Sequence, residues 1–262
     1  MSVVKLPRSG QYFHLLDVLW VLVAKEMKAK YKAASLGYLW SVAQPLASAL
    51  IFYFVFKIVI RINIENYPLF LTIGLFAWQW FAVAVNNSLT SLIHNASVIK
   101  KINFPRALIP ASIVVIEMIH FIITTPVLIG MMVSFNFKPH LNTIFVLPAV
   151  LVLQFVFTLA VCLFVSAANL FFRDMERVVT IFMTLLFYLT PVVYAFDMVP
   201  ARLQHYLLLN PMAIIVTSWR DVLLHGSVKW PELAVVTLLS AGSLVASYWV
   251  FSKLSPRFAE LL

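Results

Sequence analysis

The sequence lacks the residue patterns that enzymes use for nucleotide, metal or hydrolytic chemistry. Its six glycines form no GxxxxGK[ST] phosphate loop, so the chain has no recognisable ATP site of its own. The six histidines are scattered outside any HExxH pattern, and no GxSxG motif is present, which argues against a metal site or a hydrolase nucleophile. The single cysteine, Cys162, excludes an intramolecular disulfide. We therefore expect no metal and no cofactor bound by this chain.

Charged residues are also scarce. They make up 11% of the chain and hydrophobic residues 63%, against about 25% and about 45–50% in soluble domains. This composition predicts an all-α integral membrane protein, and the absence of linkers or repeats predicts a single membrane domain over residues 1–262. The net charge of +9 comes from basic residues that flank apolar segments, which is typical of orientation signals rather than of nucleic-acid binding.

Six apolar windows are long enough to be membrane-spanning helices, since about 20 residues are needed to cross about 30 Å of hydrocarbon. They cover residues 36–60, 69–93, 108–135, 142–172, 178–196 and 233–252. An even number of spans puts both termini on one side. Of the 19 lysines and arginines only six fall on the opposite side, namely Lys57, Arg61, Lys138, Arg202, Arg220 and Lys229. By the positive-inside rule both termini are expected in the cytoplasm.

Residues 11–34 contain an apolar stretch that is too short to cross a membrane. The apolar run is only Val18–Ala24, and lysines follow it directly. Apolar residues at mostly helical spacing predict an amphipathic helix in the cytoplasmic interface. A seventh span is the alternative, and it would move the lysine cluster outside. The N-terminus has no continuous apolar region of the kind found in a cleaved signal peptide.

Residues 197–232 are also too polar to span, yet they are rich in leucine and isoleucine. They predict two short helices that are separated at Asn210 and Pro211, the N-cap and first residue of the second helix. Each helix is too short to cross, so we expect a re-entrant or interfacial hairpin on the outer face.

Glu117 is the one acidic residue inside a predicted span, and His120 follows it at helical i,i+3 spacing. An ionisable group within a membrane is costly and should face the bundle interior or a wet cavity. The pair is either a proton relay or polar patch, or a packed pair that fixes helix register. We favour the second, since a coupled transporter normally has more than one such group.

Aromatic residues are in excess, at 15% of the chain. Those near span ends are typical of interfacial anchors. Others lie deeper in the first and fifth predicted spans, where they either pack against lipid or line a path for a carbohydrate chain. These are Phe52, Tyr53, Phe56, Phe182, Phe187, Tyr188 and Tyr194.

Four stretches in order along the chain carry a resemblance to a known family. They are "AKEMKAKYKAASLGYLWSVAQPL", "VIKKINFPRALIPASIVV", "NLFFRDMERVV" and "TPVVYAFDMVP…LLLNPM". Together they resemble the membrane subunit of type-2 ABC exporters, in particular the O-antigen and polysaccharide export branch. No single stretch is diagnostic, but the order, the length and the topology match over nearly the whole chain.

The resemblance implies a homodimer of six-span permease subunits in the bacterial inner membrane, joined to two copies of a separate cytoplasmic ATPase that binds ATP and Mg. The implied cargo is an undecaprenyl-diphosphate-linked glycan of lipopolysaccharide biosynthesis, exported from cytoplasm to periplasm. The channel between protomers would be lined by the first and fifth spans and capped outside by short re-entrant helices.

The resemblance also assigns roles to charged residues. The N-terminal amphipathic segment and the coupling loop 94–107 would contact the ATPase, and Pro105 would bound a short helix in that loop. The implied contact residues are Lys25, Lys28, Lys100, Lys101, Pro105 and Arg106, although the basic residues among them are also explained by the positive-inside rule alone.

Three arginines are candidates for holding the lipid diphosphate. Arg173 lies in the second cytoplasmic turn, where an ion pair with Asp174 or Glu176 is the favoured alternative. Arg202 and Arg220 lie on the outer side, and the alternative for both is simple exposure in a loop.

Other functions remain open from the sequence. Within the family, teichoic acid or capsular polysaccharide are alternative cargoes. An ion-driven secondary transporter would need several charged groups at mid-membrane, and only Glu117 supports it. A membrane glycosyltransferase or acyltransferase would need a catalytic acid near the interface, for which Asp174 with Glu176 is the nearest candidate.

Overall fold

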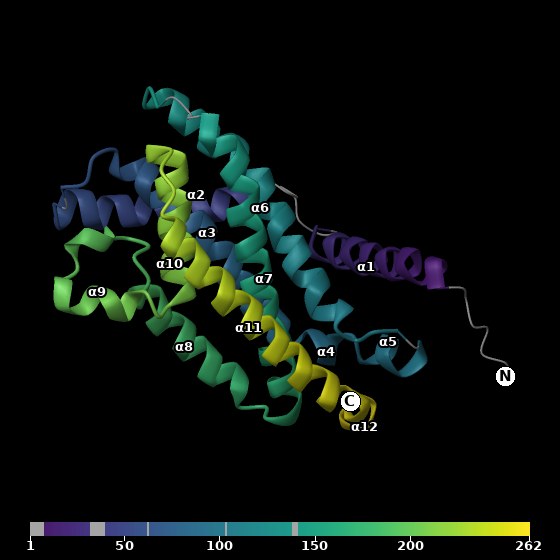
Figure 1. Cartoon of the computed structure of the whole chain (residues 1–262). Helices are drawn as coiled ribbons and strands as arrows, with labels where there is room; N and C mark the ends of the chain where they lie inside the picture. The colour runs from purple at the N-terminus through teal and green to yellow at the C-terminus, as the bar shows by residue number, and fades with distance from the viewer. Residues whose placement is uncertain (1–7, 32–39, 62, 103, 138–140) are drawn as a thin grey trace.

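The computed structural model describes residues 8–31, 40–61, 63–102, 104–137 and 141–262, and these form a bundle of helices (Figure 1). No strand occurs among the residues described. The all-α fold class that the composition predicts is therefore confirmed.

Four of the described helices are long and apolar enough to cross a membrane. They match the second, third, fourth and sixth predicted spans. They are α3 (Tyr67–Leu89), α6 (Leu108–Ser134), α7 (Leu141–Phe171) and α11 (Trp230–Leu254), and α11 continues through a 3₁₀ turn (Ser255–Arg257) into α12 (Phe258–Leu261).

The helix expected as the first span has an irregular outer half. α2 covers Trp40–Tyr53 and continues as a π-helical segment, η2 (Phe54–Val59), whose end is closed by a 2.9 Å hydrogen bond from Ile60 N to Val55 O. The first residues of the predicted span, 36–39, lie outside the described residues. The described part of this helix, Trp40–Val59, is shorter than each of the four long helices named above.

The helix expected as the fifth span is shorter than the sequence predicts. α8 (Met175–Leu189) has 15 residues, which correspond to about 22 Å against about 30 Å of hydrocarbon. It ends because Thr190 precedes Pro191 and takes an extended conformation, as residues before proline do. Six full-length spans are therefore not confirmed within the part of the chain that the structure describes.

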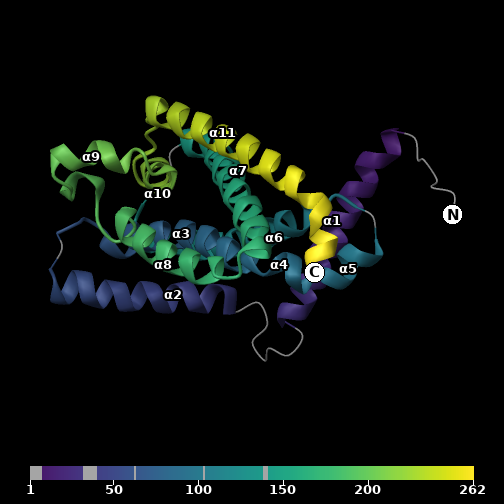
Figure 2. The same ribbon diagram turned by 90° about the horizontal axis from the view of Figure 1, so that it is seen from below.

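A long peripheral helix and three short helices gather at one end of the bundle, here called the inner end, together with the C-terminus (Figure 2). They are α1 (Arg8–Tyr31), α4 (Ser91–His94) and α5 (Ala96–Lys101), in addition to α12. A buried apolar cluster that includes Leu22 of α1, Ile99 of α5 and Phe258 of α12 packs them onto the ends of α6, α7 and α11. α1 is the helix expected at residues 11–34, of which 32–34 lie outside the described part.

A bent pair of helices carries the segment 197–232. A 3₁₀ turn (Phe196–Met198) leads to α9 (Ala201–Leu207), which lies at the opposite, outer end of the bundle (Figure 2). α10 (Pro211–Arg220) continues as a π-helical turn, η4 (Asp221–His225), and the two parts of the pair meet at 103°.

The break between α9 and α10 has the chemistry that the sequence predicts. The Asn210 side chain accepts a 3.0 Å hydrogen bond from the backbone N of Met212, with Pro211 at the first helical position. α10 is buried from Met212 to Arg220, whereas α9 is mostly exposed. The α10 half of the pair therefore lies in the protein core, while α9 lies on its surface.

α3 is the central helix of the bundle. Its residues from Leu71 to Trp78 are all buried, and it packs against α2, α6, α7, α8 and α10. The buried amide of Gln154 in α7 donates to the carbonyl of Ala77 in α3 (2.8 Å) and accepts from the indole N–H of Trp219 in α10 (2.6 Å). One side chain thus joins three helices within the buried core.

Arg220 joins the outer ends of three helices from inside the core. The side chain is 3% exposed, and its guanidinium lies 3.5 Å from the centre of the Phe70 ring. Nε donates to the carbonyl of Phe70 in the first turns of α3 (3.0 Å), while Nη1 and Nη2 donate to the carbonyls of Pro191 and Val192 beyond α8. The expectation that Arg220 is an accessible outer-loop residue, free to hold a headgroup, is therefore wrong.

The segment from Thr190 to Val193 belongs to no helix, so its backbone carbonyls lack helical hydrogen-bond partners. Side chains from other helices bind it instead. In addition to the Arg220 contacts, the Tyr67 hydroxyl donates to the Val193 carbonyl (2.8 Å) and Asn210 Nδ2 donates to the Thr190 hydroxyl (2.9 Å). A buried carbonyl without a partner costs free energy. These bonds therefore fix the outer end of α8 to α3 and α10.

Gly74 allows the close approach of Arg220 to α3, because a Cβ at this position would collide with the guanidinium and lie 3.0 Å from the Val192 carbonyl oxygen. Gly74→Ala is expected to lower the free energy of unfolding by about 1–3 kcal/mol, as overpacking in a core does. Thermal unfolding of the purified protein in detergent measures this.

The matched control is Gly130→Ala in α6, where a Cβ meets nothing within 4 Å. It should leave stability unchanged or slightly raised. Equal stability of the two variants would show that Arg220 does not need the space at Gly74.

Candidate coupling surface and translocation path

The two segments that the resemblance assigns to an ATPase contact lie together at the inner end. Lys25 of α1 donates a 2.6 Å hydrogen bond to Asn95 Oδ1, at the start of the coupling loop. Asn95 Nδ2 in turn donates to Glu26 Oε1 (3.4 Å) and to the Ser91 carbonyl (3.0 Å). α1 and the coupling loop therefore form one connected surface.

The predicted contact residues divide into two groups. Lys25 and Arg106 make internal contacts, since the Arg106 guanidinium donates to the carbonyl of Ser255 at the end of α11. Lys28, Lys100 and Lys101 are exposed. The expected short helix of the coupling loop is α5, and Pro105, which follows it, is exposed. Lys25 is exposed as well, but its ammonium group is bonded to Asn95. The other three lysines are therefore the cations that this surface offers to a partner.

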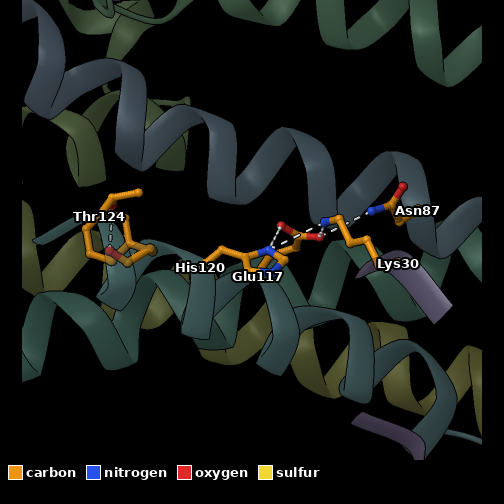
Figure 3. A network of polar contacts seen from close by, with 6 residues as sticks. Lys30, Asn87, Glu117, His120 and Thr124 are labelled. Atoms are coloured by element: carbon orange, nitrogen blue, oxygen red, sulfur yellow. Dashed lines mark hydrogen bonds and ion pairs between the residues drawn. The ribbon is translucent and has the colours of Figure 1, made fainter. Parts of the chain in front are cut away.

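A buried carboxylate connects α1 to the bundle (Figure 3). Glu117 is 5% exposed, and its Oε1 lies 3.1 Å from Lys30 Nζ of α1 and 3.3 Å from Asn87 Nδ2 of α3. Its Oε2 lies 2.9 Å from His120 Nδ1. Three helices thus meet at one carboxylate, which is satisfied on both oxygens.

The Glu117 and His120 contact is the i,i+3 pair that the spacing predicts, but the sequence analysis missed Lys30 and Asn87. It treated Lys30 only as a member of the lysine cluster that follows Val18–Ala24. The signal that could have found it is the cost of burying a carboxylate, which requires a nearby cation. The bonds to α1 and α3 support a role in fixing helix positions.

A polar hollow of about 280 Å³ adjoins this network. It lies between α1, the α3–α4 junction and α6, and Glu26, Lys30, Asn87 and Asn95 line it. The hollow is large enough for several waters. Among the described residues, no group of three or more His, Cys, Asp or Glu side chains is arranged to hold a metal ion.

The aromatic residues of the predicted path separate into packed and projecting side chains. Phe52 of α2 lies 6.0 Å from Phe56 and 5.5 Å from Phe187 of α8, and Phe187 lies 5.5 Å from Trp78 of α3, between ring centres. Tyr53 and Tyr194 are half-buried. Phe182 and Tyr188 of α8 are 56% and 61% exposed, so these two remain the outward-facing candidates.

One face of α8 carries a polar stripe that the sequence analysis did not identify. Arg177, Thr180, Thr184 and Tyr188 recur at helical spacing and are all exposed. The two threonine hydroxyls donate to carbonyls one turn earlier, of Glu176 (2.7 Å) and Thr180 (3.0 Å). Apart from Glu176 in the first turn, the other exposed residues of α8 are apolar. The lone pairs of the two hydroxyls stay available, which suits a surface that faces a polar cargo.

The remaining arginine candidates lie at opposite ends. Arg173, in the turn before α8, and Arg202, in α9, are both exposed. The favoured ion pair of Arg173 with Asp174 or Glu176 is not formed in this described turn.

Outside the spans, Lys229 lies 3.2 Å from Asp221. Burial lowers the pKa of Lys229 and the Asp221 carboxylate raises it, and the resulting pKa lies above its ordinary value.

Comparison with known proteins gives a family match over most of the chain. The profile of the ABC-2 type transporter family matches residues 17–224.

Curated relatives extend this similarity over nearly the full length. An O-antigen export system permease protein RfbA from Klebsiella pneumoniae is 43% identical over 95% of this chain and 96% of its own. A protein of the same name from Myxococcus xanthus is 30% identical over 91% and 93%. The polysialic acid transport protein KpsM of Escherichia coli is 24% identical over 84% and 87%.

Lys30→Gln tests the connection between α1 and Glu117. We expect the free energy of unfolding to fall by about 1–3 kcal/mol, since a buried carboxylate loses its charged partner. Lys28→Gln, two residues earlier and exposed, is the control and should change stability by less than about 0.5 kcal/mol. Chemical or thermal unfolding in detergent gives both values.

The double variant Lys30→Gln/Glu117→Gln should lose less than the two single variants combined, because the two groups interact directly. Strict additivity, or a Lys30→Gln variant as stable as Lys28→Gln, would contradict the connection.

Proposed function

The chain belongs to the ABC-2 type transporter family, and from this premise we propose that it is the channel-forming membrane subunit of an ATP-driven exporter of O-antigen polysaccharide. The observation that carries the proposal is the near full-length similarity, at 43% and 30% identity, to permeases named for O-antigen export. The subunit would provide a gated path and would carry out no chemistry of its own.

A separate cytoplasmic ATPase would bind ATP and Mg and drive the transport. The chain supplies no phosphate loop, while the inner end presents Lys28, Lys100 and Lys101 on helices that Lys25 and Asn95 hold together. Carboxylates on two ATPase copies would meet these lysines. Because α1 also reaches Glu117 through Lys30, a movement of the ATPase would be transmitted to α6 and α3.

The channel would form between two copies of this chain. α2 and α8 would be its first and fifth passes, in a six-pass subunit with both termini in the cytoplasm, and their exposed faces would meet across the dimer axis. The α9–α10 pair would be a re-entrant cap on the periplasmic side. The anchoring of the α8 outer end by Arg220 supports a firm outer rim.

The glycan would pass along the polar stripe of α8. Hydroxyl oxygens of Thr180 and Thr184 accept hydrogen bonds from sugar hydroxyls, and the ring of Tyr188 offers a flat apolar face to a sugar ring. The undecaprenyl diphosphate carrier would be met by Arg173 at the inner end and by Arg202 at the outer end, both of which are exposed.

A capsular polysaccharide is the second candidate cargo, because the similarity extends to a protein named for polysialic acid transport. The identity is lower, at 24%, so O antigen stays the first choice. None of the relatives named above carries a name that refers to teichoic acid. An ion-driven transporter would explain neither the exposed lysines at the inner end nor the match to the ABC-2 family.

The function is tested by reconstituting the chain with its partner ATPase and a lipid-linked O antigen in proteoliposomes. Export should require both proteins and ATP. The triple variant Lys28→Glu/Lys100→Glu/Lys101→Glu should lose co-purification with the ATPase and lose export, because like charges would then face each other. Arg61→Glu, an exposed reversal beyond α2, is the control and should retain both. Export driven by an ion gradient without the ATPase would disprove the proposal.

The path is tested by Thr184→Trp, which places a bulky ring on the polar stripe. We expect export to fail while insertion and ATPase binding remain, since the change touches no packed residue. Leu238→Trp on α11, where the side chain is 74% exposed, is the control for an added tryptophan. Surface labelling of O antigen in cells that contain only the variant measures export. Unchanged export with Thr184→Trp would place the path elsewhere.

A further inference from the structure

An apolar groove of about 620 Å³ runs along the inner part of the bundle, between the first turns of α6, the second half of α7 and the second half of α11. Small residues, Ala107 and Ala111, and the buried side chain of Leu163 line its floor. Tyr248 and Trp249 stand at its α11 side and are 56% and 61% exposed. The remaining lining is almost entirely aliphatic.

Two basic residues lie beside lining residues of this groove near the inner end, and a third basic residue follows in the chain. Arg106 directly precedes Ala107 of the lining, and its guanidinium donates to the Ser255 carbonyl, so it connects the start of α6 to the end of α11. Lys253 Nζ lies 5.0 Å from the centre of the Trp249 ring. Arg257 is exposed one turn later, and Glu260 is the acidic residue on the following turn.

We propose that this groove binds an anionic phospholipid of the cytoplasmic leaflet. Its volume lies within the range of about 300–1,000 Å³ that is typical of sites for small apolar ligands. The apolar length would take an acyl chain, while Arg106, Lys253 and Arg257 would meet the phosphate. Basic pockets between transmembrane helices on the cytoplasmic side are suited to acidic headgroups.

Charge distinguishes this occupant from a second copy of the chain. A two-fold interface places the same patch of both copies face to face, so these cations would oppose one another. A zwitterionic lipid would fill the apolar length equally well but would leave the three cations opposite a headgroup without net charge. The anionic lipid satisfies both parts of the site, whatever cargo the protein moves.

Native mass spectrometry of the full chain in mild detergent tests the site with two probes that share acyl chains, dioleoyl phosphatidylglycerol and dioleoyl phosphatidylcholine. The first should be retained at least about tenfold better, since each lysine or arginine near an acidic headgroup contributes about a fivefold gain in affinity. The variant Arg106→Gln/Lys253→Gln/Arg257→Gln should lose this preference. Lys253→Gln alone, which leaves the Arg106 contact intact, should reduce it by about fivefold.

A substitution that fills the groove distinguishes the contribution of its shape to lipid binding from the contribution of its charge. Ala111→Phe should lower retention of both lipids, whereas Gly130→Phe, which adds the same ring on α6 where a Cβ meets nothing within 4 Å, should not. Equal retention of the two lipids by the unaltered chain, or unchanged retention by the triple variant, would overturn the proposal.

A thiol placed in the groove gives a second measurement. Val245 lines the groove and is 70% exposed, while the native Cys162 is buried, so Val245→Cys provides an accessible thiol. Phosphatidylglycerol should slow its reaction with a membrane-soluble maleimide, and phosphatidylcholine should not. Efficient disulfide cross-linking between two copies through this thiol would identify the occupant as a second chain and overturn the lipid site.

Discussion

Buried charge needs a partner inside the protein, because neither hydrocarbon nor a packed apolar core offers a hydrogen bond. In this bundle that constraint acts at two places. Near the inner end, Glu117 contacts Lys30, Asn87 and His120. At the outer end, Arg220 donates hydrogen bonds to carbonyls of α3 and of the segment beyond α8. Apolar packing alone would leave the same helices free to rotate or slide, whereas these contacts set their positions.

The two charged centres divide the molecule by role. The inner one connects a peripheral helix, α1, to the bundle, and the outer one holds the end of α8 against α3 and α10. α8 lies between these two ends and carries the exposed polar stripe. A helix that is firmly held at its outer end and that begins in an exposed turn at its inner end would suit the proposed path if its control lies at the inner end.

Length and apolarity were enough to predict the long helices, since α3, α6, α7 and α11 coincide with apolar windows. The same rule overestimated α8, because the residues beyond Leu189 are apolar but Pro191 stops the helix. Asn210 and Pro211 could be predicted as a helix start because capping is local in sequence. The resemblance, carried by four short stretches, anticipated the family that the comparisons then confirmed.

Long-range polar contacts could not be predicted in this way. Lys30 and Glu117 are 87 residues apart, and Arg220 and Phe70 are 150 apart. Lys30 has the same local pattern as Lys28, and Arg220 looks like any arginine that ends an amphipathic helix. Only the packed arrangement shows that one lysine reaches a buried carboxylate and that the arginine is enclosed. The helical spacing of Arg177, Thr180, Thr184 and Tyr188 can be read from the sequence. Because these residues lie in or beside an apolar window, the sequence indicates part of a span there and not a polar stripe.

The π-helical segment η2 gives α2 a property that α8, the other helix of the proposed path, does not have. A π-helical turn holds one residue more than an α-helical turn, and such turns are rare and concentrated at functional positions. If that extra residue moved along the helix, each side chain it passed would turn by about 100° about the axis without any change at the inner half. The exposed side chains of Phe54 and Ile58 would then exchange places with their neighbours around the helix. The π-helical turn is thus a position at which α2 can rotate locally while its inner half stays fixed. On the proposed path, a polymer would then be accommodated by twisting one helix rather than by separating the bundle.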